Sequence, residues 1–363
     1  MRLLYVCGTY APGAMSGSEL SAHTLLRHLA AQHGAEVLVL TDERYSDGSG
    51  EERRYDGVRL RGTAHERRQR AIAEAIERFA PDVVFTQLVW ADVALRVANE
   101  ARVPTLFRIA SVPLGLDLRL GSPLAPTAIV VASRFVAAHV RATWDRDAHV
   151  IPPSIDLARV TAAATADRRF ITMFNPIEEK GGSLFRALAM SLPRRAFAVV
   201  PGWSVLRRSD GAWDEELWQR SLDSQGWGPY PLPREPSFAD LPNVTVLPPR
   251  EKVAEIYAQT RILCVPSRWE EPFGRVAIEA FANGIPVVAT AIGGMQEHAG
   301  MGGLAIPPAS GVEAWVAAIE SLDDPGLYAR LAASGRAAAE ARFSLEATTA
   351  PWLAVFRALV SDG

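Results

Sequence analysis

The sequence contains little cysteine, almost no lysine and no hydrophobic run of membrane-spanning length. Its two cysteines, Cys7 and Cys264, lie within apolar strand patterns, which indicates buried thiols in a reducing cytosol rather than disulfides. Because no stretch is long enough to cross a bilayer, we expect a cytoplasmic protein whose membrane contact is at most peripheral. The net charge of −3 provides no field that would attract nucleic acid, so nucleic acid is not an expected partner.

Two common sequence signatures are also missing. No G-x-G-x-x-G follows the first predicted strand, which argues against a nicotinamide-dependent dehydrogenase. The histidines show neither metal-ligand nor catalytic-triad spacing; they are His23, His28, His33, His65, His139, His149 and His298. Among them, His298 is expected to cap or pack rather than to react.

What the sequence does contain is a regular alternation of strand and helix patterns over 363 residues, a length typical of two domains. The predicted strands are Leu3–Cys7, Glu36–Thr41, Val83–Thr86, Thr105–Ile109 and Ile129–Ala132, then Phe170–Phe174, Ala196–Val200, Val244–Leu247, Ile262–Val265 and Val287–Thr290. The helical patterns between the first five are Glu19–Gln32, Glu66–Phe79, Asp92–Ala101 and Arg134–Thr143. Such alternation predicts an α/β protein with two doubly wound parallel sheets.

The segment 262–298 has the clearest pattern. A buried strand ends at Val265, a polar loop follows, and a short helix begins near Gly274. The loop and the helix carry two carboxylates, Glu271 and Glu279. Ligands of parallel sheets bind beyond the carboxyl ends of the strands, where helix N-termini attract anions. A ligand with both phosphates and hydroxyls, such as a sugar nucleotide, would explain two acids beside an anion site.

The residues Glu271-Pro272-Phe273-Gly274, followed by Glu279-Ala280 and the turn Gly293-Gly294, resemble the E-x7-E signature of retaining GT-B glycosyltransferases of family 4. The resemblance implies that Glu271 holds hydroxyls of the donor sugar and that Glu279 holds the ribose. It also implies that the amides of Phe273 and Gly274 face the sugar and phosphate. The simpler alternative is that Glu271 only complements the dipole at the helix N-terminus and that Glu279 is solvated. This alternative explains neither the Pro-Phe-Gly sequence nor the Gly-Gly turn.

A second segment of the resemblance is Asn175-Pro176-Ile177-Glu178-Glu179-Lys180-Gly181, after the first strand of the second series. Lys180 matches the lysine that holds the diphosphate, where an ammonium neutralises charge on the leaving group. The family's arginine is replaced here by Asn175. Arg275 or Arg108 could supply the missing charge as a phosphate or sugar contact.

The loop Gly13–Glu19 resembles the family's Gly-Gly-x-Glu loop near the donor phosphates, with Ser16 in place of the first glycine and Gly17 as the expected contact. Ser16 or Ser18 acting only as a helix cap is the alternative. The family often has a histidine after the strand Thr105–Ile109, but none is present. Either the backbone and Arg108 orient the sugar instead, or turnover is slow or lost.

The resemblance also implies a domain organisation: an acceptor domain over 1–155, a nucleotide-sugar donor domain over 156–344, and a helix in 345–363 that packs back on the first domain. Two segments depart from the regular alternation. Residues 203–242 hold Trp203, Trp213, Trp218, Trp227 and Tyr230, and predict an insertion that is either a lid or a packed excursion. The arginine-rich segment Arg44–Arg78 predicts a solvated helix face, with contact to an anionic acceptor or membrane surface as the alternative.

The sequence therefore predicts a retaining transferase that moves a hexosyl or aminohexosyl group from a nucleotide diphosphate sugar, UDP-linked by expectation, to a hydroxyl acceptor. Asp145-Arg146-Asp147 has a D-x-D spacing but follows a helix, and Lys180 can replace a cation, so neither an essential metal nor a cofactor is expected. Two alternatives stay open: a sugar-nucleotide binding protein without transfer activity, and an epimerase or hydrolase of the sugar nucleotide. The acceptor and the oligomeric state are not encoded in a recognisable motif.

Overall fold

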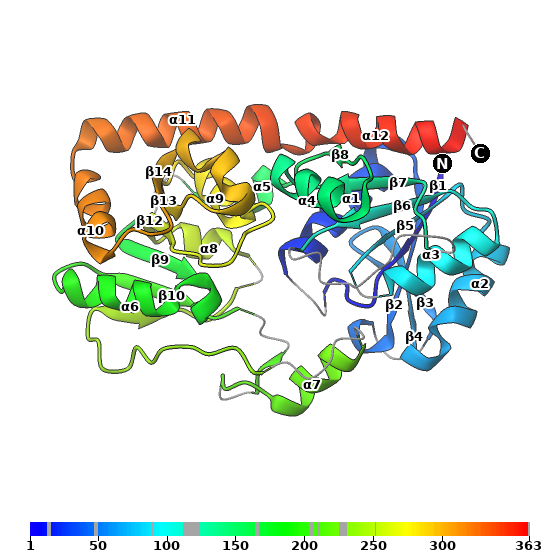
Figure 1. Cartoon of the computed structure of the whole chain (residues 1–363), viewed down its shortest axis with the longest axis horizontal. Coiled ribbons are helices and arrows are strands. Elements are labelled where there is room, and N and C mark those ends of the chain that lie inside the picture. The colour runs from blue at the N-terminus through cyan, green and yellow to red at the C-terminus, as the bar shows by residue number, and fades with distance from the viewer. Residues whose placement is uncertain are drawn as a thin grey trace. The chain divides into compact units, whose positions relative to one another are not determined.

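The computed structural model describes residues 1–12, 16–46, 50–88, 90–111, 124–163, 167–202, 206–208, 211–224, 231–250 and 252–361. The chain divides into two compact units (Figure 1). The first unit comprises Met1–Ser154, Val205–Tyr230 and Thr348–Gly363, and the second comprises Ile155–Ser204 and Pro231–Ala347. Each unit is built on its own sheet, which confirms the predicted α/β class.

The first unit contains an eight-stranded sheet that is parallel except for one edge strand. In spatial order its strands are β3 (Glu52–Tyr55), β4 (Val58–Thr63), β2 (Glu36–Asp42), β1 (Arg2–Val6), β5 (Val83–Gln87), β6 (Thr105–Ile109), β7 (Ala128–Val131) and β8 (His149–Val150). The predicted strands match these to within about two residues at either end.

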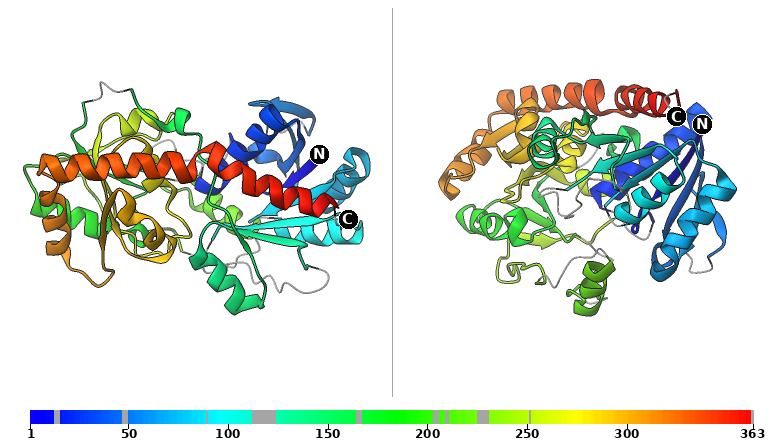
Figure 2. Two further views of the ribbon diagram at one scale, coloured as in Figure 1. Left: turned by 90° about the horizontal axis from the view of Figure 1, so that it is seen from above. Right: turned by 45° about the vertical axis from the view of Figure 1, so that its right-hand side comes forward.

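Helices cover both faces of this sheet because successive residues of each buried strand point to opposite sides. Tyr5 and Phe85 pack with α1 (Gly17–His33) and with residues of α12 (Leu345–Ser361), while Leu4 packs on the other face. The remaining helices of this sheet are α2 (Arg68–Phe79), α3 (Ala91–Glu100) and α4 (Arg134–Trp144). The C-terminal helix α12 lies along the first unit (Figure 2). It buries Trp352, whose ring lies 5.7 Å from that of Phe85.

The arginine-rich segment is only partly helical, so the prediction of a helix face is wrong for its first half. The antiparallel hairpin β3–β4 turns at Asp56 and Gly57, both of which have positive φ angles of 47° and 86°. An Asp-Gly pair favours this turn, and Val58 and Leu60 point inward while Arg59 and Arg61 remain half-buried. The alternation of apolar and charged residues after Asp56-Gly57 could have indicated this hairpin. Short 3-10 turns, Glu43–Tyr45 and His65–Arg67, flank the hairpin.

The second unit contains a six-stranded sheet in which all pairs are parallel. Its spatial order is β11 (Val244–Val246), β10 (Phe197–Val200), β9 (Phe170–Phe174), β12 (Thr260–Val265), β13 (Val287–Thr290) and β14 (Gly303–Ile306). The chain adds β10 and β11 on one side of β9 and then returns to place β12 on the other side. The order of strands therefore reverses between β9 and β12, which is where ligands of doubly wound sheets bind.

Helices also cover both faces of the second sheet. Phe185 and Trp315 are buried against Phe197 on one face. The helices are α5 (Leu157–Val160), α6 (Gly182–Ser191), α8 (Ala254–Tyr257), α9 (Arg275–Ala282), α10 (Val312–Ser321) and α11 (Pro325–Phe343), with 3-10 turns at Glu178–Lys180, Gly293–Glu297 and Ala299–Met301. Both cysteines of the chain are buried free thiols, as predicted, and burial raises the pKa of Cys7 to about 11.

The segment predicted as an insertion belongs to both units. Trp213 and the helix α7 (Glu215–Ser224) fall in the first, where the rings of Trp213 and Trp218 are 5.9 Å apart; Trp203, Trp227 and Tyr230 lie outside the described residues. Residues 231–242 fall in the second unit, where Phe238 is part of the core and the Arg234 carbonyl accepts a hydrogen bond from the Glu178 amide at 2.8 Å. This second half is a packed excursion.

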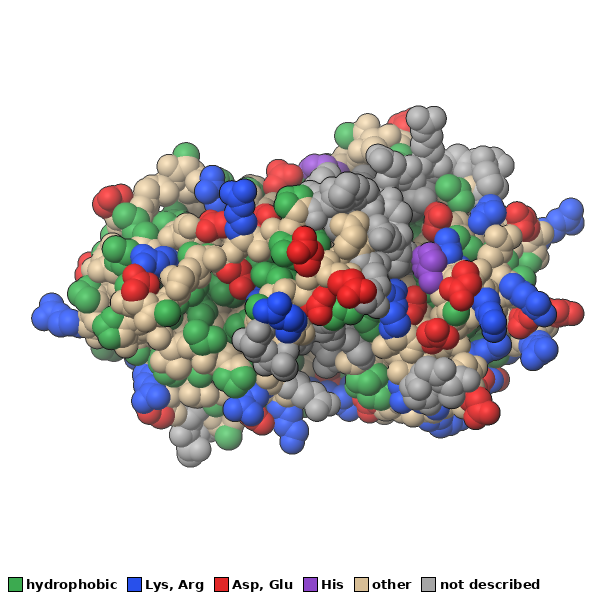
Figure 3. Space-filling model, turned by 90° about the horizontal axis from the view of Figure 1, so that it is seen from below, with side chains coloured by type: hydrophobic (Ala, Val, Ile, Leu, Met, Phe, Trp, Pro, Cys, Tyr) green, Lys and Arg blue, Asp and Glu red, His purple; other side chains and the backbone are tan. Residues whose placement is uncertain are grey.

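Acidic and basic side chains are interspersed over the described part of the surface shown in Figure 3. Several of the charges form ion pairs, for example Arg59 with Glu52 at 2.6 Å and Arg70 with Glu74 at 2.8 Å. None of the described helices combines the length and the apolar character that crossing a membrane requires.

Candidate functional site

Two loops meet at the carboxyl edge of the second sheet, at the point where the strand order reverses. One follows β9 and carries Lys180, and the other follows β12 and carries Glu271. The amides of Arg268 and Trp269 both donate to the Glu179 carbonyl at 2.9 Å, which ties the loops together. The two sequence motifs, about ninety residues apart along the chain, therefore form one site because the sheet order makes their strands neighbours.

Lys180 and Glu271 form an ion pair, with 2.5 Å between Nζ and Oε1. The same carboxylate oxygen accepts a hydrogen bond from the Ser267 hydroxyl at 3.2 Å. The lysine side chain is 25% exposed and that of the glutamate 12%, so the pair is reachable from solvent but partly desolvated. The positive charge expected to hold the diphosphate is thus paired with the carboxylate expected to hold the sugar.

Glycines allow the backbone of this site to pack closely. Gly181, with φ of +88°, lies so near the end of β12 that a Cβ would come within 1.9 Å of the Pro266 carbonyl oxygen. Gly293, with φ of +58°, lies behind Glu271, where a Cβ would come within 2.6 Å of its carbonyl oxygen. The Gly294 amide donates to that carbonyl at 2.7 Å. Both glycines have a positive φ that side chains rarely tolerate, which explains their place in the motif.

The residues after Glu271 lead into helix α9. Phe273 is buried, and Gly274 has a φ of +84° as the residue before the first helical turn. A helix of eight residues begins directly after it. The free N–H groups of a helix start favour a negatively charged group nearby. These amides follow Glu271 closely in the sequence, on the loop and first helical turn after β12.

Glu279 lies one turn into α9 and is buried, with 7% of its side chain exposed. Its Oε1 accepts from Arg275 Nε at 2.5 Å, and its Oε2 accepts from the Tyr257 hydroxyl at 2.9 Å. The structure therefore brings Arg275 and Glu279 together, and the guanidinium that was expected to contact a phosphate or sugar is engaged by this carboxylate.

Asn175 directly follows β9 and takes a left-handed conformation with φ of +53°. Its amide donates to the Val200 carbonyl at 2.7 Å, which joins it to the end of β10. Its side-chain Oδ1 is buried and has no hydrogen-bond partner among the described residues. Asn175 thus lies on the same sheet edge as Lys180, at the start of the segment after β9 that carries this lysine.

The first unit holds the other two predicted contacts, Gly17 and Arg108. Gly17 begins α1, and Gly13, Ala14 and Met15 lie outside the described residues. Arg108, at the end of β6, is buried and donates to Gln87 Oε1 at 3.0 Å and to the Ser18 carbonyl at 3.3 Å. Arg108 and the start of α1 are therefore neighbours at the carboxyl edge of the first sheet.

Glu19 is the glutamate of the Gly-Gly-x-Glu resemblance, but no contact was predicted for it. It is buried and accepts hydrogen bonds from the hydroxyls of Thr9 and Ser18, each at 2.7 Å, and from that of Ser16. The three residues with short hydroxyl side chains near Glu19 in the sequence, Thr9, Ser16 and Ser18, could have indicated that this acid is hydrogen-bonded. The carboxylate holds the start of α1, and Ser16 and Ser18 donate to it rather than capping the helix by a side-chain hydrogen bond.

His298 packs beside the Glu271 loop, as predicted. Its ring lies 4.8 Å from that of Phe273 and 6.0 Å from that of Phe343 on α11. Burial lowers its pKa to about 4, and the positive charge of Arg342 adds to this effect. His298 is therefore a neutral aromatic spacer behind Phe273 at physiological pH.

We expect the unfolding free energy to fall as the pH falls from about 6.5 to about 4, because the folded His298 resists a proton that the unfolded one accepts. The contribution is complete above the ordinary pKa and amounts to at most about 3 kcal/mol. Chemical denaturation across this range should show a shallower slope against pH for His298→Gln than for the wild type. The same substitution at the exposed His149 is the matched control, and equal slopes for His298→Gln and the wild type would refute the prediction.

Neither Tyr257 nor Ser267 was predicted to take part in the site. Tyr257 is a buried aromatic residue at the end of α8, three residues before β12 begins at Thr260, a position typical of core packing. Ser267 follows Pro266 in a polar loop. Neither carries a motif, since their roles depend on carboxylates brought near by the fold.

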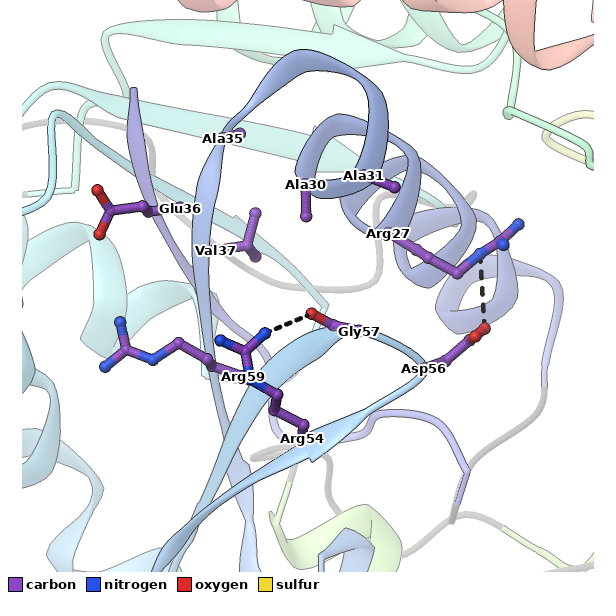
Figure 4. A pocket seen from close by; sticks show the side chains of 10 residues that line it. All are labelled: Arg27, Ala30, Ala31, Ala35, Glu36, Val37, Arg54, Asp56, Gly57 and Arg59. Carbon is purple, nitrogen blue, oxygen red and sulfur yellow. Dashed lines mark hydrogen bonds and ion pairs between the residues drawn. The ribbon is translucent and has the colours of Figure 1, made fainter.

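A cavity of about 280 Å³ lies elsewhere, between α1 and the β3–β4 hairpin of the first unit (Figure 4). It borders Glu36, the first residue of β2, and so lies at the amino edge of the sheet. Its arginines have partners: Arg27 contacts Asp56 at 3.5 Å, and Arg54 donates to the Gly57 carbonyl at 3.2 Å. This cavity is therefore unrelated to the residues of the sequence motifs.

No group of three or more His, Cys, Asp or Glu side chains arranged to hold a metal ion occurs in the described part of the chain. The D-x-D residues Asp145 and Asp147 have side chains that are 89% and 96% exposed, and both contact Arg141. They lie after α4 and not at the end of a strand.

Comparison with known proteins identifies two family matches. Residues 15–159 match Glycosyltransferase Family 4, and residues 214–324 match Glycosyl transferases group 1. A D-inositol 3-phosphate glycosyltransferase of Mycobacterium marinum is 41% identical over 125 residues, which cover 33% of this chain and 26% of that protein. One from Segniliparus rotundus is 32% identical over 228 residues, covering 59% of this chain and 47% of that protein. The matched part thus spans less than two thirds of these relatives.

Solved structures match over the whole chain. Sucrose-phosphate synthase from Thermosynechococcus elongatus has a TM-score of 0.75 at 19% identity, and the match covers 100% of this chain and 100% of that one. Anabaena HepE, solved with UDP and glucose, has a TM-score of 0.76 at 17% identity, covering 99% of this chain and 100% of that one. At such identities the likeness shows the fold. The chain therefore matches glycosyltransferase family models over two of its segments, and it has the GT-B fold.

Proposed function

We propose that the protein is a retaining glycosyltransferase that moves a hexosyl or aminohexosyl group from a UDP-sugar to a hydroxyl acceptor. The observation that carries this proposal is the Lys180–Glu271 pair at the strand-order reversal, on the same edge as Glu279 and the start of α9. One ligand that needs a cation, a helix N-terminus and two hydroxyl-binding carboxylates is a nucleoside diphosphate sugar.

Each residue has a role in this proposal. Lys180 leaves Glu271 and neutralises the diphosphate, while the freed carboxylate of Glu271 accepts hydrogen bonds from sugar hydroxyls. The amides of Phe273 and Gly274 face the sugar and phosphate, and Glu279 accepts from the ribose. Gly17 is a further contact that we propose on the resemblance. Arg108 and Asn175, which lie where the sequence departs from the family pattern, are further phosphate or sugar contacts that we propose.

The proposed reaction keeps the anomeric configuration. The bond between the anomeric carbon and the diphosphate oxygen breaks, and a bond from the acceptor oxygen forms on the same face of the sugar. The acceptor's proton passes to an oxygen of the leaving phosphate. Lys180 stabilises the negative charge that develops there, so we propose that no divalent metal is required.

The nucleotide base is proposed from similar structures. Anabaena HepE has been solved with UDP, with UDP-glucose, and with UDP and glucose. The curated relatives are named for D-inositol 3-phosphate, a hydroxyl acceptor, but the matched region covers too little of them to transfer that acceptor to this chain. We propose a cytoplasmic location with at most peripheral membrane contact.

A thermal-shift screen with UDP, GDP, TDP, ADP and NAD, each with and without EDTA, tests the proposal. A ligand at about a hundred times its dissociation constant adds roughly 2.7 kcal/mol, which raises the melting temperature by several degrees in domains of this size. We expect a shift with UDP that EDTA does not change. No shift with any nucleotide would refute the donor site, and a shift that EDTA abolishes would refute metal independence.

One observation favours a second candidate, a binding protein without transfer activity. The strand end that often carries the family's histidine holds Arg108 instead, and this guanidinium is engaged by Gln87. Incubation of the UDP-sugar with and without a mixture of hydroxyl acceptors separates the candidates. Stable donor in both cases indicates binding alone, and UDP release or isomerisation without an acceptor indicates a hydrolase or epimerase.

A further inference from the structure

The carboxylate of Glu279 is held from two sides by donors. Arg275 Nε contacts Oε1 at 2.5 Å, and the Tyr257 hydroxyl donates to Oε2 at 2.9 Å. Arg275 comes from the start of the same helix, but Tyr257 comes from α8, a separate element that precedes β12. The orientation of the carboxylate is therefore determined by the tertiary structure and not by α9 alone.

Tyr257 is itself rigidly placed. Its side chain is fully buried, and its ring lies 5.6 Å from that of Phe174, the last residue of β9. Burial, together with the nearby charge of Glu279, raises the pKa of the phenol well above its ordinary value, so the hydroxyl keeps its proton. The Val276 carbonyl is a second acceptor at 3.3 Å, and the shorter contact is to the carboxylate.

The two contacts leave Glu279 with unused capacity. A carboxylate has about four lone-pair positions, of which Arg275 and Tyr257 occupy one each. About two positions therefore remain, one on each oxygen. Two neighbouring hydroxyl donors would match these two positions. The ribose of a ribonucleotide has two free hydroxyls, whereas the sugar of a 2′-deoxyribonucleotide has one.

We propose that Tyr257 is a positioning residue that makes the donor site selective for ribonucleotides over 2′-deoxyribonucleotides by fixing the Glu279 carboxylate. This inference rests on the proposed function, in which Glu279 accepts from the ribose. Without the phenol, the carboxylate is held on Oε1 only and can rotate away from the geometry that matches two hydroxyls. The site then favours sugars carried on ribonucleotides over those carried on 2′-deoxyribonucleotides.

The test is the ratio of dissociation constants for UDP and 2′-deoxy-UDP, measured by calorimetry on the full chain. We expect the wild type to bind UDP about tenfold more tightly, the value of one hydrogen bond to a charged group. In Tyr257→Phe the ratio should fall to about two, mainly through weaker UDP binding. Tyr328→Phe is the matched control, because its hydroxyl donates to the Arg261 carbonyl at 2.8 Å in the same unit.

The outcomes separate this inference from the proposed function. An unchanged ratio in Tyr257→Phe, or equal weakening of both nucleotides, would mean that the phenol only stabilises the fold, and would overturn the inference while the donor site stands. Absence of any nucleotide binding by the wild type would overturn the proposed function as well. Glu279→Gln provides a second variant that leaves Tyr257 in place, and it should also reduce the ratio.

Discussion

Glu271→Gln is expected to lower the rate of sugar transfer by about 100- to 1,000-fold, the range found when one preorganised polar contact is removed from a reacting group. The neutral amide keeps the shape of the side chain but accepts weaker hydrogen bonds from sugar hydroxyls. Nucleotide binding should persist, and we expect UDP to bind at least as tightly as before. The reason is that Lys180, whose Nζ lies 2.5 Å from Oε1 of the carboxylate, no longer has to leave a full ion pair.

Steady-state kinetics with the UDP-sugar and calorimetry with UDP measure the two effects separately. The adjacent Glu270 is exposed, so Glu270→Gln makes the same change in net charge without touching Lys180 and should leave both quantities unchanged. Unchanged transfer in Glu271→Gln would remove this residue from the site. Loss of UDP binding together with transfer would instead show that the carboxylate supports the loop and not the sugar.

Lys180→Ala is expected to weaken UDP binding by roughly 10- to 100-fold, since a charge-assisted hydrogen bond contributes about 1.5–3 kcal/mol. Free uridine, which lacks phosphates, should bind with little change. Transfer should fall further than binding, because the charge on the departing diphosphate is greater in the transition state than in the bound donor. Calorimetry with UDP and with uridine measures the two dissociation constants, and kinetics at saturating donor measures the rate of transfer.

The chain offers one matched control for this substitution. Lys252 is the only other lysine in the sequence and is exposed, so Lys252→Ala should affect neither UDP nor uridine. Equal weakening of UDP and uridine by Lys180→Ala would mean that the lysine is not a phosphate ligand. Because the two residues form one ion pair, the effects of Lys180→Ala and Glu271→Gln on UDP binding should not add.

The class of fold could be predicted from local patterns. Strands such as Thr105–Ile109 and Phe170–Phe174 match the observed ones because continuous apolar runs bounded by polar loops allow few alternatives in a doubly covered parallel sheet. The β3–β4 hairpin was missed because charged residues dominate its composition. Its signal was the Asp56-Gly57 turn and the alternation around it, which a search for amphipathic helices overlooks.

The motif residues could likewise be named in advance, but not their partners. The spacing of Glu271 and Glu279 places one in a loop and the other on a helix, and this depends only on local structure. That Lys180 contacts Glu271, and that Tyr257 contacts Glu279, depends on which strands are neighbours. Sequence separation carries little information on such pairs, because the order of strands in a sheet differs from their order in the chain.

The sequence by itself determined the two series of strands and helices, the two buried thiols, and the loops that carry the charged and glycine residues. All of these follow from side-chain polarity and backbone preference over a few neighbouring residues. Only the tertiary structure decided that Arg275 is bound to Glu279, that Arg108 is engaged by Gln87, and that the phenol of Tyr257 lies against a carboxylate. The physical reason is that a buried charge takes its partners from whatever elements the packed core brings within hydrogen-bond distance.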